Sequence, residues 1–196
     1  MYYSFFALVS RMRNITRWSL MRNTAVENVQ EHSHMVAVLA HALAVISRDI
    51  FEVETDPDKT AAAALFHDAS EIFTGDLPTP IKYFDPDIMF AYKRVESVAA
   101  QKLLASLPAA MRPAYQQLLS PGESNDIMQL VKAADKLAAY IKCLDELKSG
   151  NLEFRLAAEQ SREKLESLGL PEVDYFLKHF IPAFELTLDE LDFTFD

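Results

Sequence analysis

The chain has 196 residues, of which 50% are hydrophobic, and this is enough for one domain with a sizeable core. Its formal net charge of −10 argues against a nucleic acid polymer as a partner, because such binding requires a basic surface. Cys143 is the only cysteine, which excludes an intrachain disulfide and a thiolate metal cluster and is typical of a reducing cytoplasm. The scarcity of glycine, with only 4 residues, favours helices with short connections over a β-sandwich.

The N-terminal segment does not have the pattern of a targeting signal. Its apolar run, residues 5–9, is short and precedes the arginines, whereas a signal peptide has the opposite order and a longer apolar core. No apolar stretch approaches the roughly 20 residues that are needed to span a bilayer. We therefore expect a soluble cytoplasmic protein that has no membrane partner.

Cap signals and apolar spacing predict helices along most of the chain. Asn28 followed by Glu31 resembles a capping box, and Asp56-Pro57 and Asp85-Pro86 each supply an N-cap followed by a proline. We expect helices over residues 4–13, 28–48, 57–74, 86–106, 108–119, 124–149, 153–168 and 173–180. The predicted fold class is all-α, with one domain over residues 1–196.

Three segments fall outside these helices. Residues 14–27 show no clear period and are interpreted as a loop. Pro78 and Pro80 argue against a helix over residues 76–80, so a stiff loop is expected there. The tail from Pro182 is rich in phenylalanine and leucine and must pack somewhere, either on its own domain or on a partner subunit.

Three ionisable residues follow the apolar, alanine-rich run of residues 61–66. His67 and Asp68 are adjacent, and Glu71 lies at i+4 from His67 and i+3 from Asp68. On a continuous helix these three side chains project from one patch. Burying charge is costly unless it is paired or bound to a metal. The alternative is a surface histidine beside two solvated acids, which the crowding by apolar neighbours makes less favourable.

His32 and Asp135 complete a candidate metal site. His32 lies on the inward stripe of the second predicted helix, and Asp135 borders the inward stripe of the sixth, whereas His34 and His41 fall on other faces. Two imidazoles and two carboxylates suit a divalent first-row metal, which can polarise a phosphoryl group and activate water. A lone histidine on an apolar stripe is more often a hydrogen-bonded core residue, so the interpretation depends on the whole set. Glu71 is positioned to exchange a proton as a general acid or base.

The ordered motif Glu31-His32-Ser33, His67-Asp68 and Asp135 resembles that of the HD-domain metal-dependent phosphohydrolases. The resemblance is closer at Arg17-Trp18, at residues 74–80 (TGDLPTP) and at residues 139–144 (AYIKCL). These segments are similar to the bacterial 5′-deoxynucleotidase family of that superfamily, which removes phosphate from deoxyribonucleoside 5′-monophosphates.

The resemblance implies a single HD-domain helical bundle, a homodimer, and cobalt, manganese or copper as the divalent transition metal. The implied metal ligands are His32, His67, Asp68 and Asp135. Glu71 matches the proton donor, and Arg17 matches the residue that orients the phosphate. The implied walls of the sugar and base site are Trp18, Asp76, Leu77, Pro78 and Thr79. Two of the implied metal ligands, His32 and Asp135, are also implied to contact the substrate.

Two other functions stay open at this point. One is an HD hydrolase of another nucleotide, such as a cyclic nucleotide, an alarmone or a triphosphate. Larger polyphosphates require more cations, and the matching segments offer mainly Arg17 and Lys82. The other is a helical nucleotide-binding or scaffold protein without catalysis, which the intact ligand set and Glu71 argue against.

Overall fold

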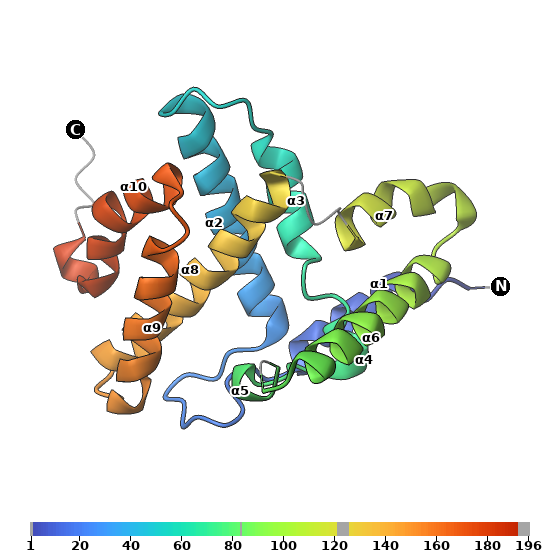
Figure 1. Ribbon diagram of the computed structural model, residues 1–196, viewed down its shortest axis with the longest axis horizontal. Coiled ribbons are helices and arrows are strands. Elements are labelled where there is room, and N and C mark those ends of the chain that lie inside the picture. Colours follow the sequence, from blue (N-terminus) through green and yellow to red (C-terminus); the bar gives the residue numbers. More distant parts are fainter. Residues whose placement is uncertain (1, 83, 121–125, 192–196) are drawn as a thin grey trace.

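The computed structural model describes residues 2–82, 84–120 and 126–191, with the side chains of Thr79 and Pro80 left out. Within these ranges the chain is helical and has no strand, which confirms the all-α prediction (Figure 1). The helices are α1 (Phe5–Val9), α2 (Val29–Asp49), α3 (Pro57–Leu65), α4 (Glu71–Thr74), α5 (Thr79–Lys82), α6 (Pro86–Ala105), α7 (Arg112–Leu119), α8 (Asp126–Lys148), α9 (Arg155–Glu166) and α10 (Pro171–His179). Short 3-10 helices cover Ser10–Asn14, Ala109–Met111, Leu152–Phe154, Ile181–Glu185 and Leu188–Glu190.

The helices pack in two groups, each with its own apolar core. In the larger group α2 and α8 cross at the centre and α3, α9 and α10 surround them (Figure 1). The buried side chains of this group include Leu43, Leu137 and Phe154. In the smaller group α1, α6 and α7 pack around Phe5, Leu103 and neighbouring residues. The turn between α3 and α4 joins the two groups.

The predicted N-caps are confirmed. The Asn28 side chain accepts from the backbone of Gln30 and Glu31, and the Glu31 carboxylate accepts from the Asn28 backbone in return. Asp56 accepts from the backbone of Lys59 and begins α3, and Asp85 begins α6 in the same way. These caps fix where the long helices enter the fold.

The predicted third helix, residues 57–74, is wrong in its second half. α3 ends at Leu65 because the backbone of Phe66 leaves the helical region, with φ −113° and ψ 3°. Residues 66–70 form turns, and Glu71 starts the separate helix α4. His67 and Asp68 therefore lie in a turn and not on a helix. Consecutive residues of a helix point about 100° apart, and the turn instead allows both side chains to face the same place.

The stiff loop predicted over residues 76–80 is also only partly right. Residues 76–78 are not helical, but the short helix α5 begins at Thr79 and contains Pro80 in its first turn, where a missing N–H costs nothing. Gly75 precedes the loop with φ 71° and ψ 170°, a conformation that other residues rarely adopt. This glycine lets the chain turn away from α4 before Asp76.

The described part of the C-terminal tail packs only partly on its own chain, because Leu186 and Leu188 are exposed. Ile181 is buried, and Phe184 packs against the larger core. The ammonium of Lys148 on α8 donates to the backbone oxygen of Leu186. Phe193 and Phe195 lie outside the described residues. Among the helices of the described ranges, none combines the length and the hydropathy that a membrane span requires.

Candidate metal centre and substrate cavity

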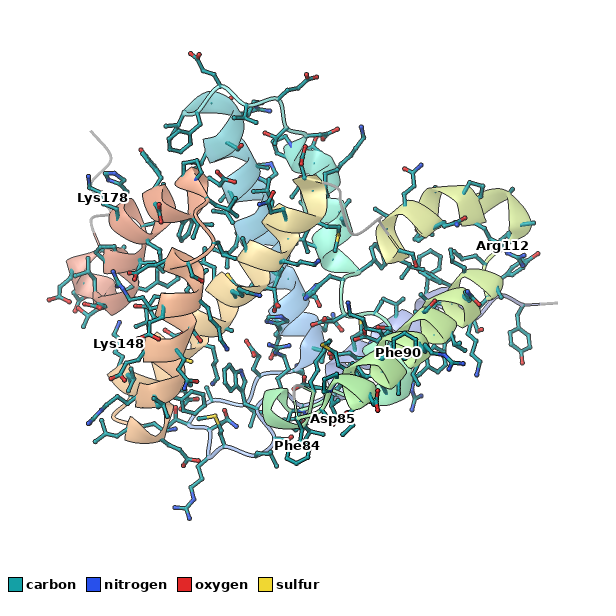
Figure 2. The ribbon with its side chains drawn as sticks, in the orientation of Figure 1. Phe84, Asp85, Phe90, Arg112, Lys148 and Lys178 are labelled. Carbon is teal, nitrogen blue, oxygen red and sulfur yellow. The ribbon has the colours of Figure 1, made fainter. Side chains whose placement is uncertain are left out.

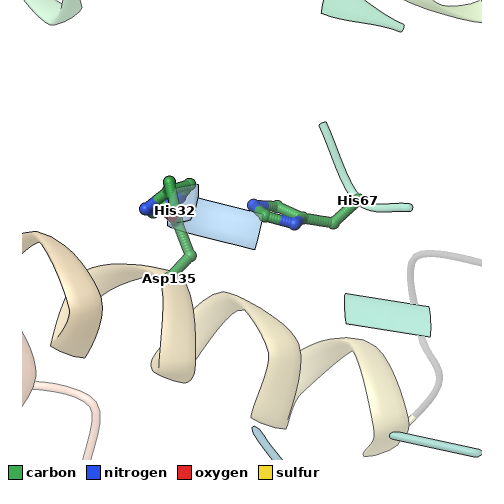
Figure 3. Close-up of side chains that lie close together, drawn as sticks. All are labelled: His32, His67 and Asp135. Carbon is green, nitrogen blue, oxygen red and sulfur yellow. The ribbon is translucent and has the colours of Figure 1, made fainter. Parts of the chain in front are cut away.

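Three elements bring His32, His67 and Asp135 together (Figure 3). His32 comes from α2, His67 from the turn after α3, and Asp135 from α8. One candidate ligand atom from each lies within 4.8 Å of the other two. His32 Nε2 lies 3.0 Å from Asp135 Oδ1, and the His32 ring is fully buried. The packing of α2 against α8 therefore fixes the distance between these two residues.

Asp68 adds a fourth candidate ligand. Its Oδ2 atom lies 3.0 Å from His67 Nε2 and 3.7 Å from His32 Nε2. Asp68 thus lies beside the cluster of His32, His67 and Asp135, and both His67 and Asp68 reach it from a turn and not from a helix.

The orientation of His67 fits a cation at this point. Its Nδ1 lies 2.7 Å from the backbone oxygen of Ala64, which can only accept, so Nδ1 carries a proton. In the neutral ring Nε2 then carries a lone pair, which is buried and accepts no hydrogen bond, although the acceptor atom Asp68 Oδ2 lies 3.0 Å away. A lone pair facing the carboxylates of Asp68 and Asp135 is unfavourable unless a positive charge lies between them. The nitrogen and oxygen donors suit a divalent transition metal.

The electrostatics of the cluster lead to the same conclusion. Burial lowers the pKa of His67, but the charges of Asp68 and Asp135 outweigh it and raise this pKa to about 9. Burial raises the pKa of Asp135, yet its hydrogen bond to His32 and the nearby cationic groups hold the value well below its usual range. The cluster therefore attracts positive charge, which a bound metal ion or a protonated histidine can supply.

Glu71 lies beside the cluster, and its surroundings favour the neutral form of its carboxyl group over the charged form. Its side chain is buried, and its Oε2 atom makes no hydrogen bond. Burial, followed by the charges of Asp68 and Asp76, raises the pKa of Glu71 to about 9. Without a bound cation the carboxyl group is therefore protonated at neutral pH and can act as an acid.

Arg17 and Trp18 reach the cluster from the loop between α1 and α2. Arg17 Nη1 lies 3.5 Å from Asp68 Oδ2, and Arg17 Nε donates to Glu27 Oε2 over 3.0 Å. The indole Nε1 of Trp18 donates to the same Glu27 oxygen over 3.1 Å. Trp18 itself has φ 57°, a strained left-handed conformation for a bulky residue. Glu27 thus holds the guanidinium and the indole next to each other.

A cavity of about 320 Å³ opens beside these residues. Six of the predicted site residues line it: Arg17, Trp18, Asp76, Leu77, Pro78 and Asp135. The other lining residues are Ser19, Leu20, Met21, Lys136, Ala139, Ser161 and Lys164. The side chain of Thr79 lies outside the described part of the structure. The volume suits a small ligand of nucleotide size.

Lys82 and His41, which the sequence also drew attention to, do not line this cavity. Lys82 pairs with Glu96 over 3.5 Å and lies 5.0 Å above the ring of Tyr92. His41 lies 3.8 Å from Asp58 at an exposed position, in agreement with its placement on another face.

A family model described as 5′-deoxynucleotidase YfbR-like matches residues 4–184. The chain belongs to this family. A 5′-deoxynucleotidase from Vibrio atlanticus is 47% identical over 95% of this chain and 97% of its own length. Another from Cronobacter sakazakii is 48% identical over 95% of this chain and 94% of its own length.

Solved structures show the same fold. An HD-domain phosphohydrolase from Listeria innocua is 26% identical, with a TM-score of 0.79 over 92% of this chain and 88% of its own. A cyanophage S-2L HD phosphohydrolase, solved with dA and one catalytic Zn²⁺ ion, is 22% identical, with a TM-score of 0.64 over 92% of this chain and 96% of its own. Because the cyanophage protein is only 22% identical to this chain, its similarity shows the fold alone.

Sequence reasoning missed several residues around this YfbR-like site. Glu27 gave no signal because it lies in a segment without a period. Lys142 and Glu146 have a spacing that does indicate a role. They lie 7 and 11 residues after Asp135, so they share its face of α8. Charged residues on an inward face indicate a buried polar contact.

Proposed function

We propose that this chain is a metal-dependent phosphomonoesterase that hydrolyses deoxyribonucleoside 5′-monophosphates to deoxyribonucleosides and phosphate. The observation that carries the proposal is the cavity that joins Asp135 of the ligand cluster to Arg17, Trp18 and Asp76. The printed names of the relatives, 5′-deoxynucleotidase, support this substrate class. The protein is a hydrolase that acts on phosphoric monoesters.

The proposed metal ligands are His32, His67, Asp68 and Asp135. A divalent ion bound there supplies Lewis acidity toward a phosphoryl oxygen and lowers the pKa of water. The mixed nitrogen and oxygen donor set accepts several first-row ions, and we propose cobalt, manganese or copper. Incubation with equal concentrations of cobalt, manganese, copper and zinc in competition, followed by measurement of the bound metal, identifies the ion that binds most tightly.

Arg17 and Glu71 are the proposed catalytic residues of the chain itself. The planar guanidinium of Arg17 can donate two parallel hydrogen bonds to phosphate oxygens, and it is already directed toward the ligand Asp68. When the P–O5′ bond breaks and an oxygen from water binds to phosphorus, the leaving 5′-oxygen needs a proton. The raised pKa of Glu71 keeps that proton available at neutral pH.

The sugar and the base are assigned to the cavity walls. Asp76 is proposed to accept a hydrogen bond from the 3′-hydroxyl, and its pKa is raised by burial. Trp18 fills the space where a ribose 2′-hydroxyl would project. Leu77, Pro78 and Thr79 are proposed to contact the sugar and base, and His32 and Asp135 to contact the phosphate from the metal side. The main contacts then involve groups that every nucleotide shares, so the dependence on the base is modest.

We further propose that the chain works as one domain over residues 1–196 and as a homodimer in the cytoplasm. Large apolar side chains are exposed just before α6 and near its start: Phe84 is 82% exposed and Phe90 is 65% exposed (Figure 2). Exposed apolar groups of this size are typical of an interface. Phe90→Glu should therefore lower the mass measured by sedimentation, whereas Leu156→Glu, at 62% exposure on α9, should not.

A second class of substrate, nucleotides with more phosphate groups such as triphosphates, is favoured by one observation. Lys136 and Lys164 line the same cavity as Arg17, so it holds more cations than the sequence segments predicted. Phosphate release should be measured from a panel of deoxyribonucleoside and ribonucleoside monophosphates, cyclic nucleotides, diphosphates and triphosphates. The proposed function requires the highest kcat/KM for the deoxyribonucleoside 5′-monophosphates, and a preference for triphosphates contradicts it.

A further inference from the structure

We propose that Glu146, through its contacts with Thr24, Ala25 and Lys142, is a positioning residue that sets the selectivity of the cavity by holding the Arg17–Trp18 loop in place. The proposal rests on the proposed function, because it assigns to Glu146 control over two of the residues that are expected to contact substrate. Glu146 lies three turns along α8 from Asp135 and does not line the cavity.

The carboxylate of Glu146 accepts hydrogen bonds from two residues of the loop, Thr24 and Ala25. Its Oε2 atom accepts from the backbone N–H of Thr24 over 2.9 Å and from the Thr24 hydroxyl over 2.7 Å. Its Oε1 atom accepts from the backbone N–H of Ala25 over 3.2 Å. The side chain of Glu146 is only 1% exposed, so water cannot replace these contacts. A buried carboxylate that loses its donors is strongly unfavourable, which makes the attachment firm.

Lys142 and Asn151 complete the attachment. Lys142 forms a buried ion pair with Glu146, and its Nζ donates to the backbone oxygen of Ala25 over 2.6 Å. Asn151 Nδ2 donates to Glu146 Oε2 over 2.8 Å and to the backbone oxygen of Arg22 over 2.6 Å. The loop between α1 and α2 therefore lies against the C-terminal end of α8 (Figure 1).

The loop is fixed at both ends of the segment that contains Arg17 and Trp18. At its base Thr16 pairs with Asn28, and the backbone N–H of Arg17 donates to the Glu27 oxygen over 3.0 Å. At its tip the Glu146 carboxylate holds Thr24 and Ala25. A left-handed tryptophan persists only where its surroundings hold it in that conformation. Loss of the tip contacts should release this strain.

A second set of contacts connects the ion pair with the indole through the ring of Phe154. Lys142 Nζ lies 5.8 Å from the centre of the Phe154 ring, and this ring lies 5.3 Å from the ring of Trp18. Phe154 is fully buried, so movement of the ammonium displaces the surface on which the indole rests. Glu146 therefore acts on Trp18 both through the loop backbone and through Phe154.

A structural role alone predicts a different result from a positioning role. If Glu146 only stabilises the fold, its loss reduces the fraction of active protein and scales activity on every substrate equally. If Glu146 positions Trp18, its loss changes the ratio of kcat/KM between deoxyribonucleotides and ribonucleotides, which is independent of the active fraction. Trp18 is also the only tryptophan of the chain, so its fluorescence reports its environment without substrate.

The experiment compares the wild type with Glu146→Ala, with the milder Asn151→Ala, and with Glu172→Ala as a control. Glu172 is a buried glutamate on α10, outside the loop and the cavity. For Glu146→Ala we expect about a tenfold fall in the deoxyribo/ribo ratio, which is part of the selectivity of about 10² that an apolar wall can provide. We also expect a red-shifted Trp18 emission and easier quenching by acrylamide. Asn151→Ala should shift both readouts in the same direction by less, and Glu172→Ala should change neither.

The readouts separate the two hypotheses. A wild type without any preference for deoxyribonucleotides contradicts the proposed function, whereas Trp18 emission still tests the attachment of the loop. If Glu146→Ala does not fold, Asn151→Ala decides. Unchanged emission and an unchanged ratio in the folded variants overturn the positioning role, even if their melting temperatures fall.

Discussion

Arg17 Nη1 lies 3.5 Å from Asp68 Oδ2, so the guanidinium that we assign to the phosphate is directed toward a proposed metal ligand before any substrate binds. Burial lowers the pKa of Arg17, but the charges of Asp68 and Asp135 outweigh it and keep the group charged. A phosphate that enters the cavity therefore meets a guanidinium that is already oriented, which avoids an ordering cost during the reaction.

Removal of one imidazole should abolish both metal binding and activity. We expect His67→Ala to lose its bound metal and its turnover, because the four ligands act as one site and their effects are not additive. The double variant His67→Ala with Asp135→Ala should be no less active than either single variant. Metal content by mass spectrometry and phosphate release measure this, with His41→Ala as the control that keeps both. Full turnover with bound metal in His67→Ala contradicts the site.

Glu71→Gln should keep the metal and the substrate but lose turnover by about 10²–10⁴-fold, the usual contribution of a general acid. The raised pKa of Glu71, about 9, means that the active acid form is present at neutral pH and is lost as the pH rises through that value. A bound cation lowers this pKa, so the alkaline decline of kcat should fall at or below pH 9. The pH profile of Glu71→Gln should lack this decline, and equal loss of metal and turnover would make Glu71 a structural residue.

Trp18→Ala should narrow the selectivity for deoxyribose. An apolar wall rejects an added hydroxyl by a factor on the order of 10² at most, so the deoxyribo/ribo ratio of kcat/KM should fall toward one. Asp76→Ala should instead lower activity on both sugars, because each has a 3′-hydroxyl. Substrates that lack the 3′-hydroxyl provide the control, since they should react poorly with the wild type and lose little more with Asp76→Ala.

Glu146 should make the stability of the fold depend on pH. Burial raises its pKa, but the contacts with Lys142, Asn151 and Thr24 outweigh it and hold this pKa well below the ordinary value of 4.5. A pKa that is lower in the folded state than in the unfolded state stabilises the protein at pH values above the unfolded-state pKa. This stabilisation is lost as the pH falls below about 4.5. Urea titrations at pH 7 and pH 4 should show less acid destabilisation in Glu146→Gln than in the wild type. At pH 7 Glu146→Ala should lower the free energy of unfolding by about 3–5 kcal/mol, the typical cost of breaking a buried ion pair.

The helices were accessible from the sequence because they depend on local rules, and the candidate ligand set was accessible because its ordered motif resembles that of a known family. Caps such as Asn28 with Glu31 and Asp56 before Pro57 fix helix starts through contacts within four residues. The break after Leu65 was not accessible, because alanine-rich sequence favours a continuous helix. The turn that replaces it brings His67 and Asp68 to the cluster through contacts with α2 and α8.

The attachment of the Arg17–Trp18 loop was beyond the reach of local rules. Glu146 and Thr24 are 122 residues apart, and no period in either segment indicates that they meet. The same holds for Lys164, which lines the cavity only because α9 packs beside α8. Long-range contacts of this kind depend on how helices are placed, and the pattern of one helix does not contain that information.

The most direct test of the central claim is phosphate release from a deoxyribonucleoside 5′-monophosphate by the protein stripped of metal and then reloaded. The stripped protein should be inactive, and one divalent transition metal ion bound per chain should restore full turnover in the wild type but not in His67→Ala. Full turnover by protein whose metal content is shown to be nil would contradict the account.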